Sequence, residues 1–78
     1  MKKLIPGKLY SMLDNRTVID ANTATGITIP KDSLVVFIKM IQKQTRDNPI
    51  MVFTIVYCSH MYLVRTGFPI SDVLKELD

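Results

Sequence analysis

The feature that most constrains this chain is a pair of apolar runs in its second half. Residues 50–57 and 61–64 are rich in β-branched and aromatic side chains, and only Cys58, Ser59 and His60 separate them. Runs of this composition, joined by so short a connection, predict two antiparallel strands in a hairpin. Successive side chains of a strand point to opposite faces, and both faces are apolar here, so a small domain must cover the second face.

The length of the chain limits how that cover is supplied. Its 78 residues suffice for one domain, 1–78, with a single small core. Such a core seldom supplies more than about 3–5 kcal/mol of net stability, so small domains are commonly reinforced by disulfides, metals or oligomerisation. Cys58 is the only cysteine and His60 the only histidine. We therefore predict no disulfide, no metal site and no cofactor, and self-association is favoured by elimination.

The rest of the chain also reads as mainly extended. Residues 34–41 are the hardest to assign, because they fit a strand by composition and also fit a helix capped by Asp32 or Ser33. We favour the strand, and an α+β fold with residues 33–45 helical is the alternative. The polar and small residues of 20–26 predict a mobile loop. The predicted strands span 8–13, 17–19, 27–29, 34–41, 50–57 and 61–66, and a helical turn capped by Ser71 or Asp72 is predicted over 71–77.

This order of elements resembles the small SH3-like β-barrels, and especially short SH3-like proteins of unassigned role from tailed-phage genomes. The residues that carry the resemblance are Pro6-Gly7-Lys8-Leu9-Tyr10, Ile29-Pro30-Lys31, the runs 34–39 and 50–66, and Val73-Leu74. The resemblance implies a mainly β fold, a small SH3-like antiparallel β-barrel with a short C-terminal helical turn. It also implies a phage accessory protein. It does not extend to proline-peptide recognition, because the chain has no Trp.

The N-terminal residues do not resemble an export signal. Met1-Lys2-Lys3 is followed by the short apolar pair Leu4-Ile5, which Pro6-Gly7 interrupts. A single unpaired cysteine is typical of a reducing compartment. We therefore expect a cytosolic protein, which means the host cytoplasm if a phage encodes it.

The leading functional hypothesis is a non-enzymatic interaction protein. Barrel closure buries one face of each strand, and the remaining apolar face is expected to bind a second copy of the chain or a host protein. The alternative is that the N-terminal strand and the C-terminal helix fold over this face within one subunit. The residues predicted to form the partner interface are Met51, Phe53, Ile55 and Tyr57.

Nucleic-acid binding is the alternative function, since the net charge is +3 and small barrels often place aromatic rings beside basic groups. In that interpretation Tyr10 stacks on a base, with Phe37, Tyr57 and Tyr62 as further stacking candidates. The predicted phosphate contacts are Lys8, Lys39, Lys43, Arg46 and Arg65. Catalysis has weaker support: Cys58 and His60 are the only candidate nucleophile and base, and a hairpin turn offers them no enclosed pocket.

Overall fold

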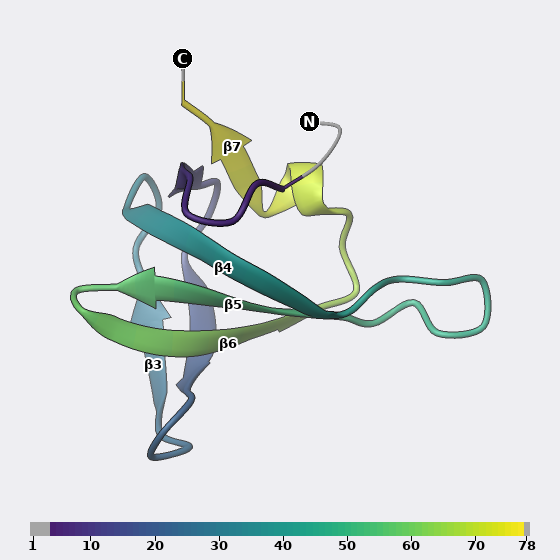
Figure 1. Ribbon diagram of the computed structural model, residues 1–78, viewed down its shortest axis with the longest axis horizontal. Coiled ribbons are helices and arrows are strands. Elements are labelled where there is room, and N and C mark those ends of the chain that lie inside the picture. Colours follow the sequence, from purple (N-terminus) through teal and green to yellow (C-terminus); the bar gives the residue numbers. More distant parts are fainter. Residues whose placement is uncertain (1–3, 78) are drawn as a thin grey trace.

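The computed structural model describes residues 4–77 and consists of one antiparallel sheet curled into a half-barrel (Figure 1). The strands are β1 (Leu9–Met12), β2 (Arg16–Asp20), β3 (Gly26–Ile29), β4 (Leu34–Gln42), β5 (Met51–Tyr57), β6 (His60–Thr66) and β7 (Leu74–Glu76). They are arranged in the order β3-β2-β6-β5-β4-β1-β7. The predicted mainly β fold is confirmed, and the alternative with residues 33–45 helical is wrong because β4 occupies that stretch.

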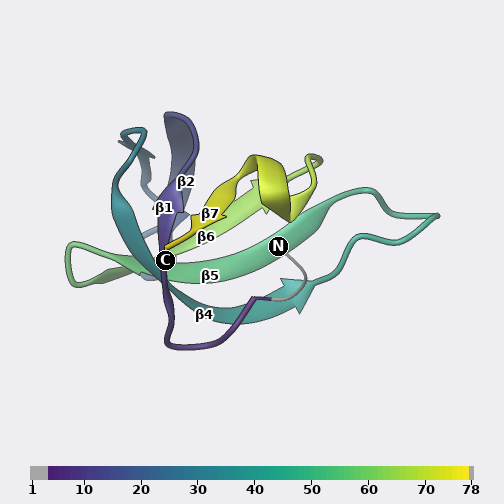
Figure 2. The same ribbon diagram turned by 90° about the horizontal axis from the view of Figure 1, so that it is seen from above.

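The two longest strand pairings, β4 with β5 and β5 with β6, form the centre of the sheet. β4 is bulged twice, once between Phe37 and Lys39 and again between Met40 and Gln42. A bulge inserts one extra residue and bends the strand. Strict alternation therefore fails along β4: Phe37 and Met40 pair with Ile55 and Phe53 of β5 and share their face. These bends contribute to the curl of the sheet, which Figure 2 shows from above.

The turn between β5 and β6 has two residues, because Tyr57 and His60 already pair with each other. Cys58 has φ 50° and Ser59 has φ 67°, so both central residues adopt the left-handed region that a type I′ turn requires. This geometry fits the right-handed twist of the strands, and it favours Asn and Gly. Left-handed backbone costs an ordinary residue roughly 1–2 kcal/mol.

Replacing the turn by Cys58→Asn together with Ser59→Gly is therefore expected to stabilise the protein by about 1 kcal/mol. Urea denaturation would measure the change. Cys58→Val is the matched control, since a β-branched residue tolerates positive φ poorly and should destabilise the protein. An unchanged or lower midpoint for the Asn-Gly variant would contradict the assignment of strain to this turn.

The C-terminal segment differs in part from its predicted form. A short 3-10 turn covers Ile70–Asp72 and follows Pro69, with no side-chain capping bond, so the predicted caps Ser71 and Asp72 are wrong. Beyond it the chain extends and β7 pairs with β1, whose other edge is bonded to β4. The reason is non-local: β1 provides a row of unpaired backbone groups, which a helix could not satisfy.

The core fills the concave side of the half-barrel. β1 contributes Tyr10 and Met12, and the C-terminal segment contributes Val73 and Leu74, all four with at most 1% of their surface exposed. They pack against the inner side chains of β4, β5 and β6. The N-terminal strand and the C-terminal segment therefore cover the apolar inner face within one subunit.

Candidate interaction surfaces

The two faces of β5 are the reverse of those predicted. Met51, Phe53 and Ile55 are 4%, 0% and 0% exposed and belong to the core, and Tyr57 is half-buried against it. The prediction that these side chains form an outward partner interface is wrong. The side chains of β5 that alternate with these are Val52, Thr54 and Val56; Val52 and Val56 are half-buried, and Thr54 is buried by its neighbours.

The register of the sheet shows which side chains share the outer face. Leu9 pairs with Val36, Val36 with Val56, and Val56 with Met61, so these residues form one row across four strands. Directly paired residues in antiparallel strands lie on the same face. Leu63 of β6 pairs with Thr54 of β5 on one side and with Ile19 of β2 on the other, and these three residues form a second row. We call the six apolar residues Leu9, Ile19, Val36, Val56, Met61 and Leu63 the outer patch.

The outer patch is accessible at its ends and partly shielded at its centre. Leu9, Ile19 and Met61 are 44%, 43% and 38% exposed, and Val36, Val56 and Leu63 are half-buried by their neighbours. None of the six is charged. An uninterrupted set of aliphatic side chains across neighbouring strands is unlike the scattered single apolar residues of ordinary surfaces. Contiguous patches of this kind are typical of interfaces.

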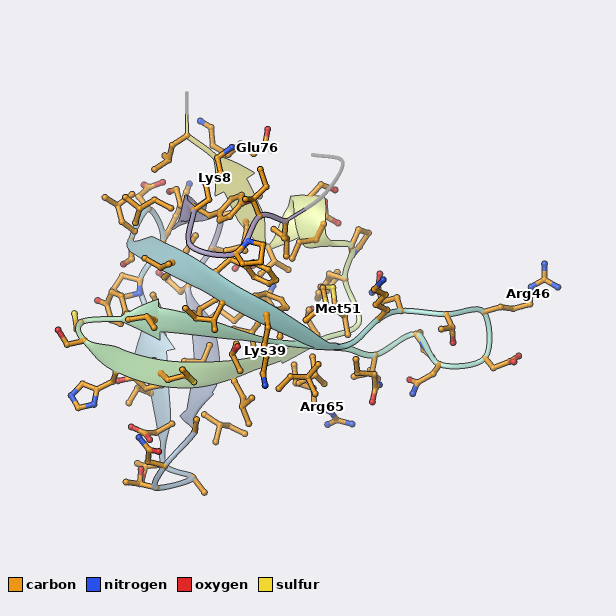
Figure 3. All side chains as sticks on the ribbon, in the orientation of Figure 1. Lys8, Lys39, Arg46, Met51, Arg65 and Glu76 are labelled. Atoms are coloured by element: carbon orange, nitrogen blue, oxygen red, sulfur yellow. The ribbon has the colours of Figure 1, made fainter. Side chains whose placement is uncertain are left out.

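Two basic residues border the outer patch on the same face. Lys39 pairs with Thr54, and Arg65 pairs with Val52, which lies further toward the β4–β5 loop. Figure 3 shows Arg65 on one side of β5 and Met51 on the other, the side that carries the C-terminal helical turn. The face therefore has an apolar region and a basic end.

The structure separates the residues predicted to bind nucleic acid. Tyr10 is completely buried, and its hydroxyl accepts a hydrogen bond from the Ile5 N–H at 2.9 Å, so its predicted stacking role is wrong. Phe37 and Tyr62 are also buried. Lys8 lies 4.0 Å from Glu76 near β7, well away from Arg46, which projects from the tip of the β4–β5 loop (Figure 3). The basic residues that remain exposed around the base and tip of that loop are Lys39, Lys43, Arg46 and Arg65.

A groove of about 790 Å³ opens between the N-terminal segment, β4, the start of β5 and the 3-10 turn. Nothing in the sequence indicated it, because its walls come from four separate segments. Lys39, Lys43 and Gln44 are its polar lining, and no carboxylate of residues 4–77 lines it. Its apolar lining consists of Leu4, Pro6, Phe37, Met40, Met51 and Ile70.

Cys58, the candidate nucleophile, lies in the turn, and His60, the candidate base, is the first residue of β6. Both are exposed, and Cys58 is an unpaired thiol. The neighbour of the His60 ring is the Tyr62 ring, at 6.4 Å between centroids. Within residues 4–77, no three side chains of the metal-binding types lie close enough together to hold an ion.

Asp20 and Tyr62, which are cross-strand neighbours, are the groups among the described residues whose pKa is shifted by their surroundings. The backbone N–H groups of Asn22 and Thr23 bond the Asp20 carboxylate and hold its pKa below the ordinary 3.8, and nearby His60 acts in the same direction. Burial raises the pKa of Tyr62, and the Asp20 charge raises it further. The carboxylate thus organises the turn that follows β2, which is a structural role.

Comparison of the chain with protein-family models, with curated proteins and with solved structures finds no match. The resemblance to phage proteins therefore stays a prediction. Over the part of the chain that the structure describes, no helix has the length and hydrophobicity needed to cross a membrane.

Proposed function

We propose that this protein is a non-enzymatic interaction module that self-associates through the outer patch. The observation that supports this most directly is the register, which joins Leu9, Val36, Val56 and Met61 into one continuous aliphatic row. Water is displaced most favourably when such a row meets another apolar surface. Apolar residues occupy both faces of the central strands, as the sequence indicated, but the exposed face of β5 is the opposite of the one predicted.

A second copy of the chain suits this face because it carries the same uncharged surface. In a twofold arrangement each patch covers the other, and the residue contacts are reciprocal. Lys39 and Arg65 lie toward one end of the face, so an antiparallel arrangement of the copies places their basic ends apart. A small domain also gains stability from burying this surface, since binding partners stabilise the folded state by mass action.

Light scattering after size exclusion tests the proposal. The wild-type protein is expected to behave as a dimer or larger species at micromolar concentration. The double variant Leu9→Lys/Met61→Lys should raise the dissociation constant by roughly a hundredfold, because each copy would bury two unpaired ammonium groups. Leu9 and Met61 are exposed enough to be replaced without unfolding.

Ile5→Lys is the matched control for these variants. It places one lysine, where the double variant has two, on an exposed apolar residue that is 51% accessible and lies outside the sheet. This variant should associate like the wild type. A wild-type protein that stays monomeric at high micromolar concentration, or a double variant that associates as strongly as the wild type, would refute self-association through the outer patch.

Nucleic-acid binding has less support from the arrangement of the side chains. Of the predicted stacking residues, Tyr10, Phe37 and Tyr62 are buried, and Tyr57 is half-buried at the end of β5 away from the β4–β5 loop. Contact with phosphates alone would be sequence-independent and strongly salt-dependent. We therefore retain protein interaction as the proposed function; a phage origin and a cytosolic location remain predictions from the sequence.

A further inference from the structure

The far end of β4 has an unpaired backbone edge. β5 pairs with one edge of β4 from Val36 to Gln42, whereas β1 pairs with the other edge only from Leu34 to Val36. Phe37 is bonded through its backbone to Gly7 and Lys8, and there the N-terminal segment leaves the strand. Among the described residues 4–77, no strand lies along this edge from residue 38 to 42. Unpaired edges of this kind can accept an additional strand.

The groove lies beside this unpaired edge. Met40 pairs with buried Phe53 and so faces the concave side, where it lines the groove with Met51. Methionine side chains are flexible and adapt to different apolar groups. A strand added to β4 would therefore direct every second side chain toward an adaptable apolar groove.

The other side chains of an added strand would lie beside Lys39. Lys39 pairs with Thr54 on the outer face, Lys43 follows the end of β4, and both lysines also border the groove. Both lysines are exposed, and neither forms an ion pair with a carboxylate of the described residues. These charges favour an acidic strand. They disfavour a second copy of β4, which would place lysines against lysines.

We propose that the unpaired edge of β4 and the adjoining groove bind an extended peptide segment in which apolar and acidic residues alternate. The backbone of the segment pairs with residues 38–42, its apolar side chains enter the groove, and its carboxylates contact Lys39 and Lys43. This surface shares no residue with the outer patch, which Lys39 borders, so the protein would bind a partner chain while it self-associates.

Fluorescence polarisation with a labelled peptide of about eight residues, alternating valine and glutamate, tests the proposal. The expected result is saturable binding that weakens with salt, and a loss of roughly tenfold for Lys39→Glu/Lys43→Glu. Arg46→Glu is the matched control, because Arg46 is an exposed cation of the same loop that does not line the groove. It should bind like the wild type. Equal losses in the two charge-reversed proteins, or no binding at all, would overturn the proposal.

Two further peptides test the strand pairing itself. Each carries N-methyl groups on one of the two alternate sets of amides, so each lacks hydrogen-bond donors along one edge only. One should lose binding and the other should keep it, since a strand at the edge of a sheet pairs along one side. Equal binding of the two, or equal binding of a valine-lysine peptide, would overturn the proposal. Leu9→Lys/Met61→Lys should still bind the acidic peptide, and loss of binding there would show that the two surfaces are not separate.

Discussion

Replacing Phe53 with alanine is expected to destabilise the protein by about 3–5 kcal/mol, which is comparable to the whole net stability of so small a core. Phe53 is completely buried at the centre of the sheet, and its ring lies 6.0 Å from that of Phe37 between centroids. Truncation would remove a large apolar group and leave a cavity between β4, β5 and β6. Guanidinium or urea denaturation followed by circular dichroism would measure the loss.

Phe68→Ala is the matched control for this substitution. Phe68 is the same residue type but is 60% exposed, and its ring has one notable contact, with the Arg16 guanidinium 5.8 Å from the centroid. Its removal should cost less than about 1 kcal/mol. A Phe53→Ala protein that is as stable as Phe68→Ala would show that β5 faces the other way. Met61→Lys and Phe53→Lys compare the two faces of the sheet in the same way, since only Phe53→Lys should unfold the protein.

Leu74→Ala is expected to cost about 2–5 kcal/mol, because this side chain is 1% exposed and closes the core from the C-terminal segment. Leu74 pairs with Met12 in β1, and the adjacent Val73 carbonyl accepts a hydrogen bond from the Leu13 N–H at 3.0 Å. The strand therefore contributes both apolar packing and backbone pairing. Thermal or chemical denaturation would report the loss.

Leu77 provides the control within the same segment. It is the same residue type and is 38% exposed, so Leu77→Ala should change the stability by no more than about 0.5 kcal/mol. The prediction would be contradicted if both leucine variants were equally stable. Such a result would mean that residues 73–76 do not pack on the core in solution.

The exposed face of β5 was predicted wrongly, and an ambiguity in the length of the next turn is enough to cause such an error. The turn can be read from the sequence as three residues, Cys58 to His60, but it has two, because His60 already pairs with Tyr57. A change of one residue in register reverses the face of every side chain that follows. The two-residue turn places Arg65 opposite Val52, and a charged side chain within β6 identifies the solvent face.

Local sequence determined the elements that depend on neighbouring residues. The β-branched and aromatic runs become β4, β5 and β6, and the break at Gly67-Phe68-Pro69 ends β6 as expected. These outcomes follow from backbone preferences and from the alternation of side chains, which act over a few residues. The same local preferences suggested a helical turn for residues 71–77, and only Ile70–Asp72 form one.

Only the tertiary structure decided which apolar face is buried, where the chain closes its core and where a groove remains. β7 extends because β1, some sixty residues earlier in the chain, offers unpaired backbone groups. The groove combines Leu4, Met40 and Ile70, which no local pattern connects. The physical reason is the same in each case: burial and hydrogen bonding are satisfied by the whole chain together, and a short segment contributes only its own preference.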